Sequence, residues 1–178
     1  MQLQLLLALT AGASMPLAFA PFAFWPIALL APAVLIYQAT LCDQTRQNFM
    51  LGFSFGLGYF GFGVSWIYHS LHVYGHAPAF VAGGLTLLMI VVLSCFIGAV
   101  LALFHQVKIR HPSIVNLWFL PLLWFSLEWL KGWVLTGFPW LSLGYAHLHS
   151  PLSGFAPIVG VYGVGSVSLL ISVLLVKW

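Results

Sequence analysis

The chain has 178 residues, of which 62% are hydrophobic and only 4% are charged. Soluble domains carry charge on about a quarter of their residues, so this composition excludes a soluble fold of this size. The net charge of +3, from five basic and two acidic residues, is too sparse to form a nucleic-acid-binding face. The composition predicts an integral membrane protein with no nucleic-acid partner.

The first apolar run covers Leu3 to Ala20 and ends in Ala-Phe-Ala, which resembles the cleavage site of a secretory signal peptide. No Lys or Arg precedes this run, and a second run of membrane length follows it at once, unlike the pattern of a signal peptide. We therefore expect the segment to be retained as the first membrane helix.

Six apolar runs are long enough to cross a bilayer, which takes about 20 residues of helix. They cover residues 3–20, 22–41, 49–68, 79–104, 116–135 and 154–176. The runs lack the alternation of membrane strands, and a helix satisfies its own backbone in lipid. The sequence therefore predicts an all-α integral membrane protein, a bundle of about six transmembrane helices that forms a single domain over residues 1–178.

Proline and glycine interrupt the first three spans. Four prolines are expected to kink or shorten the first two helices and to place a tight outer turn near residue 21; they are Pro16, Pro21, Pro26 and Pro32. In the third span, Gly52 and Gly56 have the small-xxx-small spacing that lets helix backbones approach closely. We interpret this glycine pair as a packing surface; a smooth groove for a lipid chain is the alternative.

The gaps between the runs differ in charge. The gaps at 42–48 and 105–115 and the end of the last span contain Arg46, Lys108, Arg110 and Lys177. The gaps near residue 21, at 69–78 and at 136–153 contain no charged residue. Because basic loops stay on the cytoplasmic side, both termini are expected to face the cytoplasm, and the uncharged gaps are expected to face outward.

Three histidines follow the third span at spacings that would place them on one face of a continuing helix. They are His69, His72 and His76. Such a face could bind a metal, but Tyr74, Gly75 and Pro78 predict that the helix ends here, which favours a polar interfacial rim. No metal and no other cofactor is predicted. The remaining histidines, His105, His111, His147 and His149, are expected to be solvated in loops or at helix ends.

Glu128 and Lys131 form an intramembrane pair of opposite charge in the fifth span. Their i, i+3 spacing puts them on one face of the helix. Lys131 lies near the outer end and is expected to reach the interface, whereas Glu128 lies about 10 Å inside and needs a partner or a wet cavity. Two interpretations stand side by side: a functional site, or a neutral pair that orients the helix.

The segment from Leu135 to Gly154, LTGFPWLSLGYAHLHSPLSG, is predicted to be a re-entrant or interfacial loop between the fifth and sixth helices. Its glycines and prolines stop a helix, yet it keeps aromatic rings that a solvated loop would not keep. Irregular backbone at membrane depth must be covered by protein or must line a wet cavity.

Three stretches of the sequence resemble the N-terminal membrane region of the bacterial apolipoprotein N-acyltransferases. They are PLAFAPFAFWPIALL (16–30), GFSFGLGYFGFGVSWIYHSLHVYG (52–75) and EWLKGWVLTGFPWLSLGYAHLHSPLSGFAPIVGVYG (128–163). The resemblance extends through the whole chain. The TGFPW motif followed by LGY, after an E-W-L-K-G-W helix, is specific to the family.

The resemblance implies a place in acyl transfer. In this family a helical domain in the inner membrane is joined to a nitrilase-like domain on the outer side, where a glutamate, a lysine and a cysteine pass a phospholipid acyl chain to the amine of a lipoprotein's diacylglyceryl-cysteine. The chain stops at Trp178, so none of these catalytic residues can be assigned to it. In particular, Glu128, Lys131, Cys42 and Cys95 are not those residues; each cysteine is interpreted as a small buried side chain.

The resemblance therefore implies that this chain is the membrane domain of such an enzyme, located in the bacterial inner membrane and inactive in transfer alone. Its partners would be phospholipid and lipoprotein substrates. The chain would be either a truncated product or one piece of a split gene, and in the second case a nitrilase-like half encoded separately would be a further partner. The candidate residues for lipid access are Tyr74, Phe138, Trp140 and Tyr145. The alternative is a non-enzymatic membrane protein, either a small transporter or a lipid-binding scaffold; solute flux that requires Glu128 would favour the transporter.

Overall fold

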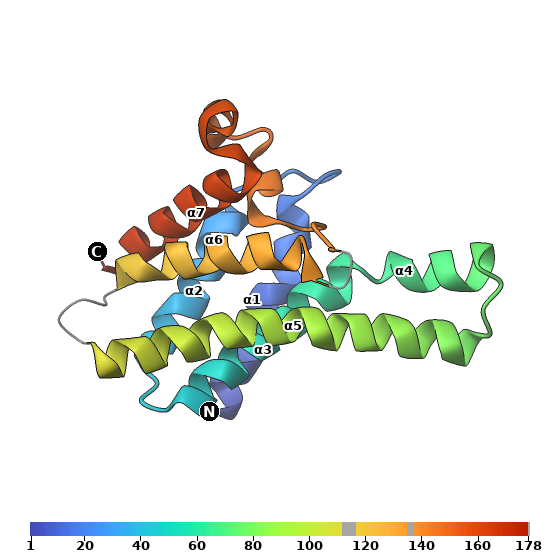
Figure 1. Cartoon of the computed structure of the whole chain (residues 1–178), viewed down its shortest axis with the longest axis horizontal. Helices are drawn as coiled ribbons and strands as arrows, with labels where there is room; N and C mark the ends of the chain where they lie inside the picture. Colours follow the sequence, from blue (N-terminus) through green and yellow to red (C-terminus); the bar gives the residue numbers. More distant parts are fainter. Residues whose placement is uncertain (112–116, 135–136, 178) are drawn as a thin grey trace.

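The computed structural model describes residues 1–111, 117–134 and 137–177, and every regular element in these ranges is helical (Figure 1). In chain order the elements are α1 (Gln2–Ser14), η1 (Met15–Ala18), α2 (Ile27–Thr40), α3 (Thr45–Gly63), α4 (Trp66–His69), η2 (Ser70–Tyr74), α5 (Ala79–Arg110), η3 (Leu117–Phe119), α6 (Leu120–Lys131), η5 (Leu143–His147), η6 (Pro151–Phe155) and α7 (Ala156–Lys177). The predicted all-helical class is confirmed.

Helix α3 is at the centre of the packing and lies against both α1 and α5. Gly58 faces α1, where a β-carbon would meet the backbone of Leu9 and Ala13. Gly52 and Gly56 face α5, where a β-carbon on either residue would approach the α5 backbone closer than 3.0 Å. The glycines of this helix therefore let three helix backbones approach one another, as the small-residue spacing predicts.

The first two helices are shorter than the predicted spans 3–20 and 22–41. Helix α1 gives way at Met15 to the 3₁₀ turn η1, which contains Pro16, and α2 begins at Ile27 with Pro26 as its N-cap. Proline lacks the N–H that continues a helical ladder, so these residues mark helix ends. The prediction of a short turn near residue 21 is confirmed, but the start of the second helix at residue 22 is wrong.

The third predicted span, 49–68, is two helices instead of one. Helix α3 ends at Gly63, and the axis bends by 46° before α4 and the π-helix η2 continue to Tyr74. The prediction that helical structure stops between residues 69 and 78 is confirmed. Together α4, η2 and the first half of α5 form an arm that projects along the long axis, away from the rest of the bundle (Figure 1).

Helix α5 is the longest of the described helices, with 32 residues, which corresponds to about 48 Å. It starts at Ala79, as predicted, but it ends at Arg110 instead of residue 104. Lys108 and Arg110 therefore lie in its last turn and not in a loop. Cations at this position interact favourably with the negative end of the helix dipole, which explains why the helix runs past the apolar segment.

The fifth and sixth helices both differ from the predicted bounds. Helix α6 ends at Lys131, with Gly132 as its C-cap, and not at residue 135. The predicted ends of this span, Asn116 and Leu135, lie outside the described residues. Helix α7 begins at Ala156 and contains a break at Gly160, whose φ of +66° is in the left-handed region that favours glycine.

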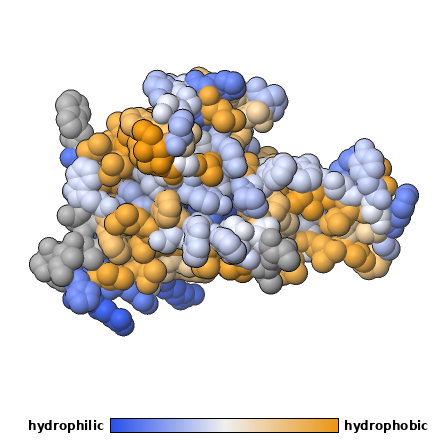
Figure 2. Space-filling model, turned by 45° about the horizontal axis from the view of Figure 1, so that its top comes forward, coloured by the Kyte–Doolittle hydropathy of each residue, from blue (hydrophilic) through white to orange (hydrophobic). Residues whose placement is uncertain are grey.

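Among the described residues, two helical stretches are long and apolar enough to cross a membrane: residues 79–110 and 151–177. The bent pair Thr45–Gly63 and Trp66–Tyr74 could be a third, and Gln2–Ala18 and Ile27–Thr40 are shorter apolar helices. Figure 2 shows hydrophobic side chains over much of one face, with strongly hydrophilic ones toward both ends of the long axis.

Candidate functional site

The segment 137–150 folds back between α6 and α7 and is held there through its backbone. Tyr59 of α3 donates its hydroxyl hydrogen to the carbonyl oxygen of Leu141 at 2.7 Å. The Lys131 ammonium of α6 donates to the carbonyl oxygen of Trp140 at 3.2 Å. Leu141 has a φ of +54°, so its backbone is neither helical nor extended. The two side chains therefore supply hydrogen bonds to carbonyl groups that would otherwise be paired within a helix or a sheet.

Glu128 is the third side chain that holds this segment. It is 3% exposed, and its Oε1 accepts a hydrogen bond from the backbone N–H of Leu143 at 2.7 Å. Its Oε2 has no hydrogen-bond partner in the part of the chain that the structure describes. The partner that this buried carboxylate needs is thus the backbone of the loop.

Lys131 is buried in the fold, contrary to the prediction that its side chain reaches the membrane interface. It is 5% exposed, donates to the loop and lies 5.6 Å from the centroid of the Phe60 ring. Two oppositely charged side chains one helical turn apart therefore both point at the same loop. The loop backbone supplies an acceptor for the cation and a donor for the anion, which is why both charges are tolerated inside the fold.

His147 is fully buried, contrary to the prediction that it is solvated. Its Nδ1 lies 2.9 Å from Ser150 Oγ, and its Nε2 lies 2.7 Å from Ser168 Oγ of α7. Ser168 also donates to the carbonyl oxygen of Ala28 in α2. This chain of contacts ties the end of the loop to two helices. Burial lowers the pKa of His147, so the ring is neutral at pH 7.

A groove of about 580 Å³ lies between the loop, the 3₁₀ turn η1 with the residues that follow it, and the end of α3. Apolar and aromatic side chains line it, among them Phe19, Phe22, Phe62, Trp66, Trp140 and Tyr145. Its volume is within the range of about 300–1,000 Å³ that is usual for small-molecule and cofactor sites. Trp66 and Trp140 approach each other with ring centroids 5.5 Å apart, so the arm and the loop meet at its wall.

The structure brings together three of the four residues predicted for lipid access. Trp140 and Tyr145 line the groove, and Phe138 stacks on Trp140 with a centroid distance of 6.3 Å. Phe138 also lines a second apolar cavity of about 280 Å³ with residues of α5. Tyr74 ends η2 in the arm, where it is 76% exposed and contacts His69, and it takes no part in lining the groove.

Two of the three histidines of the arm pack on different aromatic rings. His72 stacks on Tyr68 and its Nδ1 bonds the carbonyl oxygen of Ala77, while His69 packs on the Tyr74 ring. Among residues 1–111, 117–134 and 137–177, no group of three His, Cys, Asp or Glu side chains is arranged to hold a metal ion.

Sequence reasoning missed Tyr59, Phe19 and His147. Tyr59 is 1% exposed in the middle of a glycine-rich helix, a position that is typical of ordinary core packing, so nothing in the local pattern indicates its role. Phe19 follows Pro16, and its place in the groove depends on where η1 ends. His147 depends on Ser168, which is 21 residues further along the chain.

Comparison with known proteins gives one consistent result. The family model described as the apolipoprotein N-acyltransferase N-terminal domain matches residues 11–174. The apolipoprotein N-acyltransferase of Coxiella burnetii is 42% identical over 169 residues, 93% of this chain and 34% of that protein. Those of Methylococcus capsulatus and Photobacterium profundum are 41% and 39% identical, over 98% and 95% of this chain and 34% and 32% of theirs.

The chain thus spans about a third of the length of the curated relatives it matches. The matched region contains the glycine-rich α3, the charged end of α6 and the loop that they hold. The chain belongs to the apolipoprotein N-acyltransferase family and matches its N-terminal domain.

Proposed function

We propose that this chain is the membrane domain of an apolipoprotein N-acyltransferase and that it presents an acyl chain to the reaction. Its relatives are named for acyl transfer to lipoproteins, and this chain matches their N-terminal third. The acyl transfer itself we assign to the nitrilase-like part of the family, whether that part follows in the same polypeptide or comes from a separate one.

The observation that supports this role best is the apolar groove beside the loop. A hydrocarbon chain gains free energy wherever its surface leaves water, and a groove walled by Phe62, Trp66 and Trp140 offers such a surface. Several of the lining rings are about half exposed, for example Trp140 at 55% and Tyr145 at 45%, so an incoming chain can reach them.

The charged end of α6 has a positioning role in this proposal. Glu128 and Lys131 fix the backbone on both sides of Leu141, and Tyr59 fixes Leu141 itself. The ring of Trp140 therefore projects from a backbone that is bonded to two helices. A preorganised wall loses less conformational entropy when a ligand binds, which is the advantage of holding an irregular loop so tightly.

We further propose that the chain crosses the bacterial inner membrane about six times with both termini in the cytoplasm. The basic residues Arg46, Lys108, Arg110 and Lys177 favour this orientation, which places the groove at the outer surface. Phospholipid and lipoprotein substrates would then reach the groove from the outer leaflet.

The test is an N-acylation assay with a diacylglyceryl-lipopeptide and a phospholipid donor. The chain combined with a family nitrilase-like half is expected to transfer the acyl group, and the chain alone is not. Trp140→Ala should lower transfer by the combined protein, whereas Trp133→Ala, at a 70% exposed tryptophan that does not line the groove, should not. Transfer by the 178-residue chain alone would overturn the assignment of the chemistry to the other domain.

A lipid-binding scaffold without a role in transfer is the rival function, and the same groove would serve it. The assay separates the two functions. If phospholipid binds, and the combined protein transfers equally well with and without the Trp140 side chain, the groove belongs to a scaffold.

A further inference from the structure

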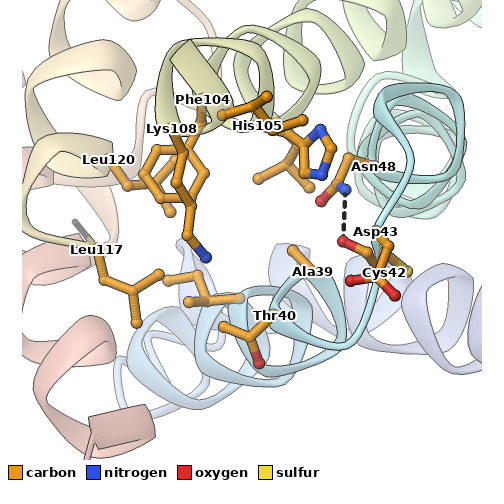
Figure 3. Close-up of a pocket in the computed structure, with 13 residues that line it drawn as sticks. Ala39, Thr40, Cys42, Asp43, Asn48, Phe104, His105, Lys108, Leu117 and Leu120 are labelled. Atoms are coloured by element: carbon orange, nitrogen blue, oxygen red, sulfur yellow. Dashed lines mark hydrogen bonds between the residues drawn. The ribbon is translucent and has the colours of Figure 1, made fainter. Parts of the chain in front are cut away.

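Another cavity, distinct from the groove and from the apolar cavity beside Phe138, lies at the opposite end of the bundle from the arm and has a different chemistry. Its volume is about 280 Å³, and it is enclosed by the end of α2, the turn that follows it, the start of α3, the end of α5 and the start of α6 (Figure 3). The groove beside the loop has no lining residue in common with it.

Charged side chains of opposite sign line this cavity. Lys108 of α5 extends its amine into the cavity, and Asp43 lies across from it, in the turn between α2 and α3 (Figure 3). Both residues are exposed, so a ligand can reach them without rearrangement. No other acid is present in the sequence except Glu128, which belongs to the loop at the other end of α6.

Two buried polar side chains continue the cavity inward. His105 is 9% exposed, and its Nδ1 lies 3.1 Å from Thr45 Oγ1. Asn48 is 1% exposed and donates to the carbonyl oxygens of Cys42 and Gln44. Burial, followed by the negative charge of Asp43, raises the pKa of the Cys42 thiol, so the thiol adds no charge. Among the described residues that line the cavity, the Lys and Asp side chains are those of Lys108 and Asp43, and the His105 imidazole lies beside them.

The remaining lining is hydrocarbon. Ile36, Leu101, Phe104 and Leu120 contribute apolar surface, and Ile109 at the mouth is 62% exposed. A ligand that fits must therefore combine a polar part that carries both charges with an apolar part. An anion alone would meet Asp43, and a cation alone would meet Lys108, each at a cost from like-charge repulsion.

We propose that this cavity binds the headgroup of a zwitterionic aminophospholipid, with its ammonium on Asp43, its phosphate on Lys108, and its acyl chains along the apolar mouth. The phosphoethanolamine group has one primary ammonium and one phosphate, which matches the lining in number and sign. This inference depends on the proposed membrane placement, but it does not depend on acyl transfer. The site lies at the end of the bundle that contains both termini, so its lipid is a bound component of that leaflet and not the acyl donor of the groove.

The experiment compares three lipids with identical acyl chains. The chain is purified in detergent, incubated with phosphatidylethanolamine, phosphatidylcholine or phosphatidylglycerol, and examined for retained lipid by native mass spectrometry. Phosphatidylcholine has the same net charge but no ammonium N–H to donate, and phosphatidylglycerol lacks the cation. Retention of phosphatidylethanolamine is expected to exceed that of the other two by about two- to five-fold, as suits ion pairs at an exposed rim.

Two variants assign the contacts. Asp43→Asn should abolish the preference for phosphatidylethanolamine over phosphatidylglycerol, and Lys108→Gln should lower the retention of all three lipids. Arg46→Gln removes a positive charge from the same end of the bundle without altering the lining, and it should leave retention unchanged. Far-UV circular dichroism confirms that each variant remains helical.

Several outcomes overturn the proposal. Equal retention of the three lipids by the unmodified chain would show that the cavity does not distinguish headgroups, and unchanged selectivity in both variants would show that Asp43 and Lys108 are not the contacts. Displacement of the lipid by an equal concentration of glycerophosphoethanolamine would indicate a soluble phosphoester as the ligand. Trp140→Ala should lower acyl transfer and preserve lipid retention at this site, so the two proposals can fail separately.

Discussion

The hydroxyl group of Tyr59 donates to the carbonyl oxygen of Leu141 across 82 residues of sequence, at 2.7 Å. This bond joins the centre of α3 to the residue of the loop whose φ is positive. Neighbouring carbonyl and N–H groups of the loop are bonded to Lys131 and Glu128. The loop that walls the groove is therefore held by three side chains from two helices, and the stability of the fold should depend on them.

Tyr59→Phe is expected to destabilise the folded chain by about 1–2 kcal/mol, because it leaves a partly buried carbonyl without this donor while keeping the ring. The free energy of unfolding can be measured by titrating the protein from dodecylmaltoside into sodium dodecyl sulfate. Tyr74→Phe makes the same chemical change at a 76% exposed site and should have no effect. Equal stability of both variants would show that the Leu141 bond contributes nothing.

Substitutions at Glu128 should separate its charge from its hydrogen bond. Glu128→Gln also removes the negative charge beside Lys131, but it keeps an acceptor oxygen for the Leu143 N–H, so it should cost about 1–2 kcal/mol less than Glu128→Leu. Glu128→Leu removes the acceptor and leaves Lys131 as a buried cation without a counter-charge, which should cost about 3–5 kcal/mol.

The same variants test the positioning role of the pair. In the combined enzyme, Glu128→Gln should retain more acyl transfer than Glu128→Leu, because the loop stays bonded. Lys131→Met, which keeps the length of the side chain, should lower transfer through loss of the Trp140 contact. If Glu128→Gln leaves both folding and transfer unchanged and Glu128→Leu does the same, neither a functional nor an orienting role survives.

The close contact of α1 and α3 predicts a sharp difference between two glycines of the same helix. A methyl group at Gly58 would meet the backbone of Leu9 and Ala13, which cannot yield without moving α1, so Gly58→Ala should destabilise by about 1–3 kcal/mol. Gly61 has open space around it, and Gly61→Ala should be neutral or stabilising by up to about 1 kcal/mol through helix propensity. The same unfolding titration measures both, and equal effects would contradict the packing role.

Most of the helices could be predicted because their cause is local. Apolar length, proline and glycine are properties of short stretches, and they identified the start of α5 and the turn near residue 21. The bend after Gly63 and the extension of α5 to Arg110 were not predicted, because an apolar count cannot distinguish a straight helix from a broken one. It also cannot see that a basic last turn continues the helix.

The candidate site also has a part that could be predicted from the sequence and a part that could not. Trp140 and Tyr145 could be predicted, since aromatic rings beside Gly137 and Pro139 are unusual in a loop. The loop's partners on α3 and α7, Tyr59 and Ser168, could not be predicted, since they lie far away in sequence. The burial of His147 is a tertiary effect of this kind: its serine partner on α7 is one of many polar residues that the chain could have used.

His147 predicts how stability depends on pH. Burial lowers its pKa in the folded chain below the value of about 6.5 that it has when unfolded. The unfolded state therefore binds more protons in this region, and stability rises with pH. The free energy of unfolding should be constant above about pH 7.5 and should fall below about pH 6.5, with a slope of up to about 1.4 kcal/mol per pH unit. His147→Gln should be less stable at pH 7.5 and should lose this slope; an unchanged slope would assign the pH dependence to another group.

The proposed orientation makes a prediction about access to the groove. Trp140→Cys and Tyr145→Cys replace side chains that are 55% and 45% exposed, and they can be made in a background where Cys42 and Cys95 are alanine. A thiol reagent that does not cross membranes should label both positions in intact spheroplasts. Gln106→Cys, at an exposed position near the other end of α5, should be labelled only after permeabilisation. The reverse pattern would place the groove in the cytoplasm, where it could not receive lipid from the outer leaflet, and would refute the proposed function together with the orientation.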